Sequence, residues 1–337
     1  MQLDRINRCR REWLRTAISS VALGTVALVS LAAEAQEWPT RPVKLVIALG
    51  PGSAGDLLAR SLAPHLQAIW KQPVIVENKP GAGGVVGAEY VVNATDGHTL
   101  LLGTLSTLLP KFTVKDLRFD PETDLVPVYR VINYQLFIAT NAKTAQKART
   151  LADVVALSKA TPNGVFFGGT GQTSIFNLTM ALVNKSLGIR YTSVDFNNVG
   201  AMNLALLRDD VQLMVNTPSS VKGQIDAGEI RPLAAISTER FPNLPDVPTV
   251  YEAAQYKGFL PLSWAGFLVP KNTPRAVVDR IARDVETVVT SPEIKKQVES
   301  QITGTLLRSS PAQFSKEFRE EAAAWKDLFA SMNIKPE

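Results

Sequence analysis

Residues 43–56 read VKLVIALGPGSAGD, and this stretch decides the fold. The run 43–49 is mostly apolar, which predicts a buried strand, and 56–70 has the apolar spacing of an amphipathic helix. The glycine-rich turn 50–55 joins the two. A strand, a tight turn and a helix in this order begin a parallel α/β unit, so the predicted fold class is α/β.

The same alternation recurs along the chain in two sets. The first set continues with strands over 74–77 and 99–103 and a helix over 85–94. The second set has helices over 151–160 (after a Thr150 cap), 174–187 and 199–208, with strands over 165–168, 191–194 and 211–215. Two sets predict two Rossmann-like lobes, which suits a chain of 337 residues.

Two extended runs, 136–140 and 264–269, flank the second set and are predicted to be the strands that cross between the lobes. The first lobe would then comprise 36–138 and 265–337, and the second lobe 139–264. Helices predicted near 274–290, 292–301 and 311–331 are expected to pack back on the first lobe.

Residues 1–35 have the pattern of an export signal. Five arginines precede an apolar run over 16–31, and Ala33-Glu34-Ala35 offers a cleavage site near Ala35. The run is shorter than the roughly 18 to 20 residues that span a bilayer. Residues 9–15 also resemble a twin-arginine signal, so both export routes stay open. We expect the mature chain in the periplasm.

Removal of the signal changes the composition. The formal net charge falls from +5 to +3, and no basic run is left, so we expect no nucleic-acid partner. Cys9, the only cysteine, is lost as well. The mature chain therefore has no disulfide, thiolate metal site or thiol nucleophile.

Catalytic and metal-binding patterns are missing from the sequence. His65 falls within a predicted helix and His98 in a turn, and structural roles are expected for both. Their spacing fits neither a metal pair nor an evident Ser-His-acid triad, and G-x-S-x-G and Walker motifs are absent. We therefore expect no enzyme activity, no metal and no cofactor.

The turn 50–55 also fits G-x-G-x-x-G, and Glu77 ends the next predicted strand. An oxidoreductase that binds a dinucleotide there, exported by the twin-arginine route, is therefore an alternative.

The favoured interpretation is a site for a small anion, because a glycine-rich turn before a helix directs free N–H groups and the positive end of the dipole to one spot. Asp56 is the expected helix N-cap. The loops 80–87, 103–107 and 168–174 are of the same kind, and none of them, nor 50–56, contains Lys or Arg. A tight turn without a ligand is the plain alternative. The predicted ligand-binding residues are Pro51, Gly52, Ser53, Ala54, Gly55, Asp56, Thr104 and Ser106 in the first lobe and Gly171, Thr173, Ser174, Asn177, Asp195, Phe196 and Asn216 in the second.

Several motifs in order resemble one known family, the extracytoplasmic receptors of tripartite tricarboxylate transporters, often called Bug receptors. They are WPTRPV at 38–43, PGSAGD at 51–56, QPVIVENKPGAGG at 72–84, DGHTLL at 96–101 and LPDVPTVYE at 244–252. The resemblance implies a type II periplasmic-binding-protein fold, with a ligand carboxylate held between the lobes by loops matching 50–56 and 168–174. It also implies membrane transporter subunits as partners. We expect a monomer, and a receptor that feeds a sensor kinase is an alternative.

The sequence departs from the family pattern in the second lobe. VDFNN at 194–198 replaces V-P-Y-K-G, and Asn177-Leu178 stands where the family often has His-Leu. We therefore hypothesise a ligand other than a tricarboxylate: a monocarboxylate, an aromatic acid, or a zwitterion whose amine faces Asp195. A solvated loop acid at Asp195 is the alternative. Phe196 and Trp264 are candidate apolar walls, with core or hinge packing the favoured role for Trp264.

Overall fold

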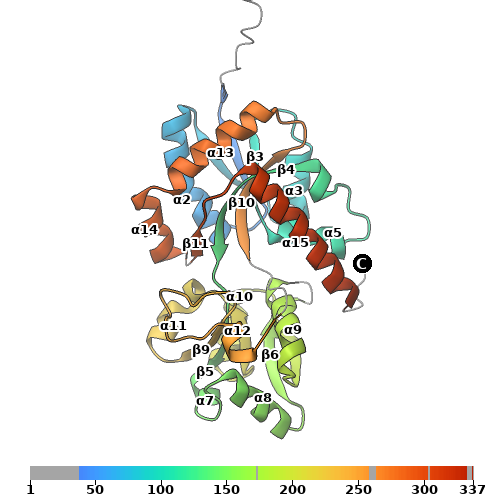
Figure 1. Ribbon diagram of the computed structural model, residues 1–337, viewed down its shortest axis with the longest axis vertical. Helices are drawn as coiled ribbons and strands as arrows, with labels where there is room; N and C mark the ends of the chain where they lie inside the picture. The colour runs from blue at the N-terminus through green and yellow to red at the C-terminus, as the bar shows by residue number, and fades with distance from the viewer. Residues whose placement is uncertain (1–37, 172–173, 258–262, 303, 332–335, 337) are drawn as a thin grey trace, which may run out of the picture. The chain divides into compact units, whose positions relative to one another are not determined.

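The computed structural model describes residues 38–171, 174–257, 263–302, 304–331 and 336 (Figure 1). The predicted export signal lies outside these residues. Contacts divide the chain into a unit of 1–40 and a compact unit of 41–337, and the fold described below is that of the second unit. Among the described helices, none combines the length and apolar character that crossing a membrane requires.

The first sheet contains six strands among the described residues, in the order β11-β4-β10-β3-β1-β2. β1, β2 and β3 are parallel, whereas β10 runs antiparallel between β3 and β4. The strands are β1 (Val43–Ile47), β2 (Val74–Asn78), β3 (Thr99–Thr104), β4 (Leu125–Tyr134), β10 (Trp264–Pro270) and β11 (Gly304–Leu306). We call this sheet and its helices the first lobe.

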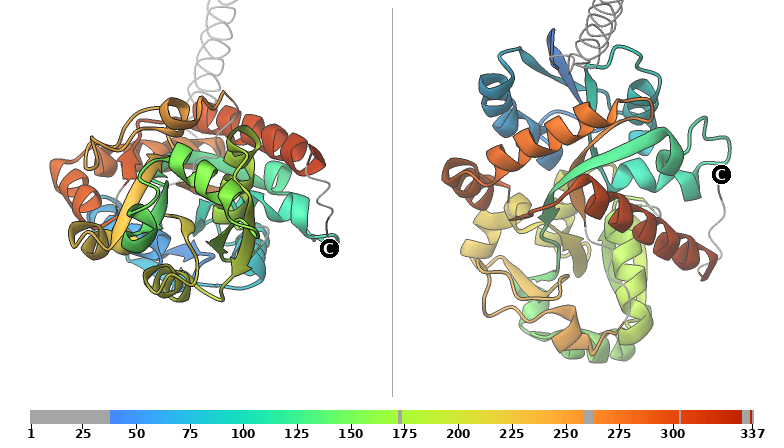
Figure 2. Two further views of the ribbon diagram at one scale, coloured as in Figure 1. Left: turned by 90° about the horizontal axis from the view of Figure 1, so that it is seen from below. Right: turned by 45° about the horizontal axis from the view of Figure 1, so that its top comes forward.

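Helices cover the first sheet, and the last three of them follow the return of the chain from the second sheet through β10. They are α2 (Ala54–Trp70), η1 (Ala82–Gly84), α3 (Val85–Val92), α4 (Leu105–Leu108), α5 (Pro110–Thr113), α6 (Pro121–Asp124), α13 (Arg275–Val289), α14 (Pro292–Gln301) and α15 (Pro311–Ser331). α13 and α15, orange and red in Figure 2, contact β4, and α14 contacts α2. The expected return of the C-terminal helices to the first lobe is confirmed.

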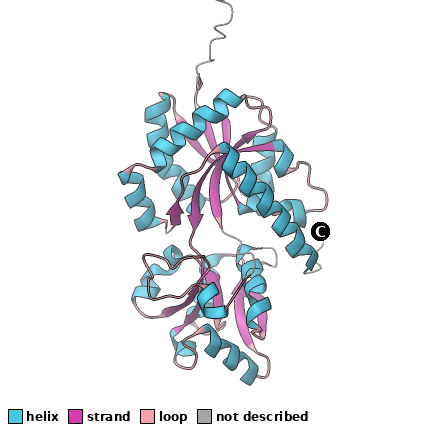
Figure 3. Ribbon diagram, viewed as in Figure 1, coloured by secondary structure: helices cyan, strands magenta, loops and turns pink. Residues whose placement is uncertain are grey.

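The second sheet has five strands among the described residues, in the order β7-β6-β8-β5-β9. Figure 3 shows strands in magenta with helices packed around them. They are β5 (Phe137–Asn141), β6 (Val165–Gly169), β7 (Tyr191–Asp195), β8 (Leu213–Asn216) and β9 (Ile230–Ala235). The accompanying helices are α7 (Ala142–Ala145), α8 (Leu151–Ala160), α9 (Ile175–Leu187), α10 (Val199–Leu207), η2 (Pro218–Val221), α11 (Lys222–Asp226) and α12 (Val250–Ala254). We call this set the second lobe.

The sequence predicted most of these elements, but it did not predict the antiparallel strands. β5 pairs antiparallel with both β8 and β9, so each sheet is mixed rather than parallel throughout. The two extended runs at the predicted crossings are strands: β5 belongs to the second sheet and β10 to the first. Only Gln135 and Leu136 separate β4 from β5. The predicted domain boundaries at 138 and 264 stay predictions.

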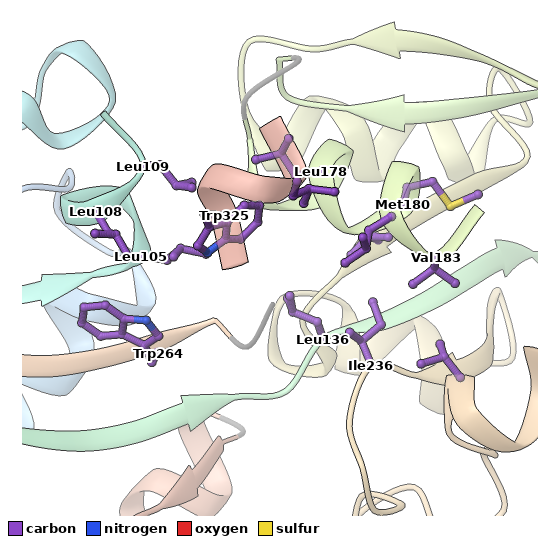
Figure 4. Packing of buried hydrophobic residues seen from close by; sticks show 14 of the residues in the cluster. Leu105, Leu108, Leu109, Leu136, Leu178, Met180, Val183, Ile236, Trp264 and Trp325 are labelled. Carbon is purple, nitrogen blue, oxygen red and sulfur yellow. The ribbon is translucent and has the colours of Figure 1, made fainter. Parts of the chain in front are cut away.

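One hydrophobic cluster contains buried residues of both lobes, including Leu105 and Trp325 of the first and Leu178 of α9 in the second (Figure 4). Hydrogen bonds between described residues also join the lobes: Lys185 Nζ donates to Ser331 Oγ at 2.7 Å, and Ser219 Oγ donates to the Ile302 carbonyl at 3.3 Å. The C-terminal segment therefore packs on the first sheet and contacts the second lobe.

Candidate functional site

The first-lobe turn is held by a serine cap and a buried carboxylate. Ser53, not Asp56, is the N-cap of α2, and its Oγ accepts a 3.3 Å hydrogen bond from the Asp56 amide. The prediction that Asp56 is the cap is wrong, because the helix already begins at Ala54. Serine is as good an N-cap as aspartate, so the earlier residue takes this position.

Asp56 instead fixes the shape of the turn from inside. Its Oδ2 accepts hydrogen bonds from the Gly52 amide at 2.9 Å and Arg60 Nε at 3.1 Å, and its Oδ1 accepts one from Asn78 Nδ2 at 2.9 Å. Burial by itself would raise the pKa of Asp56, but the hydrogen bonds from Arg60, Gly52 and Asn78 outweigh it and lower the pKa. Asp56 is therefore a charged support of the loop. Sequence reasoning missed Arg60, although its position four residues after Asp56 was a readable signal.

Three loops of the first lobe lie next to one another at the carboxyl ends of β1 and β3: 50–56, 80–87 and 103–107. A Cβ added to Gly55 would lie 3.9 Å from Thr104 Cγ2, and one added to Gly84 would lie 2.9 Å from Ser106 Oγ. Thr104 caps α4, and its Oγ1 lies 2.8 Å from Ser106 Oγ. The structure thus places Gly55 of the first turn beside Thr104, and Ser106 beside both Thr104 and Gly84. Carboxyl ends of strands are where open α/β sheets bind ligands.

Asn177 organises the second-lobe half of the site. Its Oδ1 accepts from the Thr170 amide at 3.1 Å and from Ser174 Oγ at 2.8 Å, while its Nδ2 donates to Ser193 Oγ at 3.0 Å and Asp195 Oδ1 at 2.9 Å. An amide side chain has two donors and two acceptor lone pairs, so its capacity is used. The residue is also buried, with 8% of its surface exposed. Asn177 is therefore better described as a positioning residue than as a ligand contact.

Glycine is required beside this amide. A Cβ on Gly169 would lie 2.1 Å from Asn177 Oδ1, which leaves no room for any other residue. Gly171 follows with φ +116°, a conformation that glycine tolerates and that other residues rarely adopt. Ser174 caps α9. Thr173, predicted between them, lies outside the described residues.

Asp195 and Phe196 stand beside the same turn. Asp195 pairs with Gly169 in the parallel register of β6 and β7, and the Phe196 amide donates to the Gly169 carbonyl at 2.9 Å. Asp195 is exposed, and the half-buried Phe196 ring lies 3.6 Å from the Cβ position of Gly168. Both predicted residues are thus placed at the carboxyl ends of the strands.

The side chains of Asn216 and Trp264 are buried and contact other residues of the protein. Asn216 is buried at the end of β8, where its Oδ1 accepts from the Thr217 amide and Ser220 Oγ and its Nδ2 donates to Asn203. The Trp264 ring is fully buried edge-on against Phe314 and Phe318. The packing role favoured for Trp264 is confirmed.

A separate hollow lies over α3 and touches only the end of the loop 80–87, at Val86. Its volume is about 570 Å³, and Val86, Tyr90, Asn93 and Asp96 are among the residues that line it. Its lining includes none of the described residues of 50–56, 103–107 and 168–174. Within the described part of the chain, no three His, Cys, Asp or Glu side chains are grouped so that they could hold a metal ion.

Comparison with known proteins places the chain in a family. Residues 58–334 match the model of the tripartite tricarboxylate transporter family receptor. The chain is 30% identical to protein BugT of Bordetella pertussis over 320 residues, covering 92% of this chain and 95% of BugT. It is 26% identical over 321 residues to a protein of Pseudomonas sp. strain P51 from the tcbD-tcbE intergenic region, covering 95% of each.

Solved structures agree with this placement. Rpa4515 of R. palustris, solved with adipate, has 26% identity and a TM-score of 0.78, covering 89% of this chain and all of that one. The periplasmic binding protein BugD has 25% identity and a TM-score of 0.76 over the same shares. The predicted two-lobed periplasmic-binding-protein fold is confirmed. This chain belongs to the family of tripartite tricarboxylate transporter receptors.

Proposed function

We propose that the protein is a periplasmic solute receptor that binds a small carboxylate-containing molecule and delivers it to the membrane subunits of a tripartite tricarboxylate-type transporter. One observation carries the proposal. Each lobe presents a glycine-containing turn that leads into a serine-capped helix at the carboxyl end of a strand, at Ser53 before α2 and Ser174 before α9. The adipate bound to the similar Rpa4515 is a carboxylate of the class that we propose.

Backbone amides and hydroxyls supply enough affinity for this task. The first N–H groups of a helix have no partner within the helix, and the macrodipole favours an anion there. Micromolar binding corresponds to about 8 kcal/mol, and a hydrogen bond to a charged group contributes roughly 1.5 to 3 kcal/mol. Five or six donors are therefore enough to hold a carboxylate without a lysine or arginine in the loops, and we assign them to amides and hydroxyls of the first-lobe loops and of the start of α9 that are not engaged within those loops.

Closure of the lobes is the step that delivers the ligand. Only Gln135 and Leu136 link β4 to β5, so small changes in their backbone angles rotate one sheet against the other. The ligand shifts this equilibrium as far as it prefers the closed form. No catalytic step is part of the proposal, and the receptor acts as a monomer.

A pair of cap serines provides the test. Ser53→Tyr fills the first-lobe turn, whereas Ser291→Tyr removes an equivalent cap from α14, outside the loops. Binding of organic acids is measured by calorimetry, and unfolding by thermal melting. We expect both variants to remain folded and only the Ser53 variant to lose binding. Unchanged affinity in the Ser53 variant would place the site elsewhere.

A further inference from the structure

The charges around the two half-sites are unequal. In the first lobe the buried Asp56 is paired with Arg60, which lies 3.0 Å from its Oδ1. In the second lobe the strand ends and the turn before α9 carry one charged side chain, Asp195, over 165–171 and 193–198. Among the described residues, no lysine or arginine forms an ion pair with it. The second-lobe wall therefore presents an uncompensated negative charge beside a helix start that attracts anions.

The carboxylate of Asp195 is fixed in place. Its Oδ1 accepts from Asn177 Nδ2 at 2.9 Å and from Ser193 Oγ at 3.3 Å. Within the described residues, no hydrogen bond or ion pair holds Oδ2. The acid is thus held through one oxygen while the other stays available to solvent or to a ligand.

The hydrogen bonds of Asn177 determine which end of its amide group faces Asp195. The Thr170 amide and Ser174 Oγ both donate to Asn177 Oδ1, so the oxygen must face the turn and the NH2 group must face β7. The same side chain thereby aligns the loop before α9 and the acid at the end of β7. Asp195 is opposite Gly169 in the sheet, a strand spacing of about 4.8 Å from the turn that leads to the helix start.

We propose that Asp195 makes this receptor selective for a small zwitterion, whose carboxylate binds the backbone amides at the helix start and whose ammonium group binds Asp195 Oδ2. The proposal rests on the proposed function and names the ligand class of that site. An ammonium on the α or β carbon of the ligand reaches the acid across the strand spacing. A second carboxylate placed there would meet a like charge.

The expected size of the effect follows from the separation of the charges. Two unit charges about 6 Å apart in a partly hydrated site change binding on the order of tenfold. Attraction of the ammonium adds to the affinity of an amino acid, and repulsion reduces that of a diacid. Asp195→Asn keeps the shape and the acceptor for Asn177 Nδ2 while removing the charge.

The experiment compares wild type with Asp195→Asn by calorimetry. The probes are the standard L-amino acids, the matching acids that lack the amino group, and straight-chain diacids of two to eight carbons. Asp210→Asn removes an exposed acid elsewhere in the second lobe and is the control for net charge. Thermal melting shows that each variant is folded, and Asp195→Ser repeats the test should the Asn variant melt early.

The outcomes separate the two proposals. We expect the tightest probe to be an amino acid that binds wild type at least tenfold better than its deaminated twin, and this ratio to fall at least fivefold in the Asp195 variants only. A deaminated acid or diacid that binds wild type tighter than every amino acid, or an unchanged ratio, overturns the zwitterion and leaves the carboxylate receptor intact. Failure of every probe to bind wild type overturns the receptor proposal and this inference with it.

Discussion

The indole Nε1 of Trp264 donates a 2.7 Å hydrogen bond to Oε2 of Glu321, and both side chains are buried. Trp264 begins β10, and Glu321 lies on α15. Arg130 of β4 approaches the same oxygen to 3.9 Å and lies over the Trp264 ring, 5.7 Å from its centroid. The carboxylate of Glu321 thus connects α15 with both β10 and β4.

Glu321 makes the stability of the protein depend on pH near neutrality. Burial raises the pKa of Glu321 to about 7, against the lowering effects of Arg130, Trp264 and Trp325. A carboxyl with a raised folded pKa binds its proton more tightly in the folded state, so its contribution is complete below pH 4.5 and is lost as pH rises through about 7. The loss is on the order of 3 kcal/mol. Urea unfolding between pH 4.5 and 8 measures it.

Glu321→Gln should flatten that profile. The amide keeps an acceptor for Trp264 Nε1 and has no proton to lose. Glu320→Gln, a neighbour on the exposed face of α15 paired with Lys316, is the control and should leave the slope unchanged. A wild-type stability that stays constant or rises from pH 5 to 7 would contradict the assignment.

Gly169→Ala should be strongly destabilising. The added Cβ would lie 2.1 Å from Asn177 Oδ1, so the amide would have to leave its four partners or the strand would have to shift. We expect a loss of about 2 to 4 kcal/mol and the loss of ligand binding. Gly223→Ala is the matched control, since nothing lies within 4 Å of its Cβ position and its φ is not positive. Equal melting temperatures for the two variants would refute the packing argument.

Asp56→Asn tests whether the buried acid acts on the loop. The pKa of Asp56 is lowered, so its charge adds stability above the ordinary value of 3.8 and this stability is lost as pH falls below it. Because Arg60 is half-exposed, the loss near pH 7 should be under about 1 kcal/mol. Ligand affinity should fall further, since the Gly52 amide loses a charged acceptor. Asp153→Asn, in the capping box of α8, should change stability a little and affinity not at all; a parallel loss in both variants would count against a specific role.

The sequence predicted helices best where a capping residue or a proline marks the start and an apolar stripe follows it. α8, α14 and α15 begin and end at the predicted residues, after Thr150 and at Pro292 and Pro311. β4 was missed because Pro127, Arg130 and Asn133 interrupt its apolar pattern. Arg130 donates a hydrogen bond to Glu317, which lies 187 residues away, and no local pattern predicts this partner.

The sequence predicted which loops form the candidate site, but not the hydrogen bonds that connect the residues within it. Glycine and serine at strand ends placed Ser53, Gly171 and Ser174 correctly at turns before helices. The roles of Asn177 and Asn216 depend on which distant groups fill their hydrogen-bonding capacity, and neither partner set follows from spacing. Residues predicted to contact the ligand are therefore in part residues that hold other groups in place.

Asn177→Ala gives the last prediction, which separates holding the site from touching the ligand. The substitution removes four hydrogen bonds, leaves the Thr170 amide without its acceptor and releases Asp195. We expect about 2 to 3 kcal/mol of destabilisation together with a loss of ligand affinity of tenfold or more. Asn184→Ala on the same helix removes two hydrogen bonds to the Ile189 backbone, far from the turn. It should destabilise the fold by about 1 to 2 kcal/mol and leave affinity unchanged. Denaturant titration gives both stabilities, and calorimetry below the transition gives both affinities. If Asn177→Ala unfolded more easily yet bound with wild-type affinity, the amide network would be part of the core and not of the receptor site.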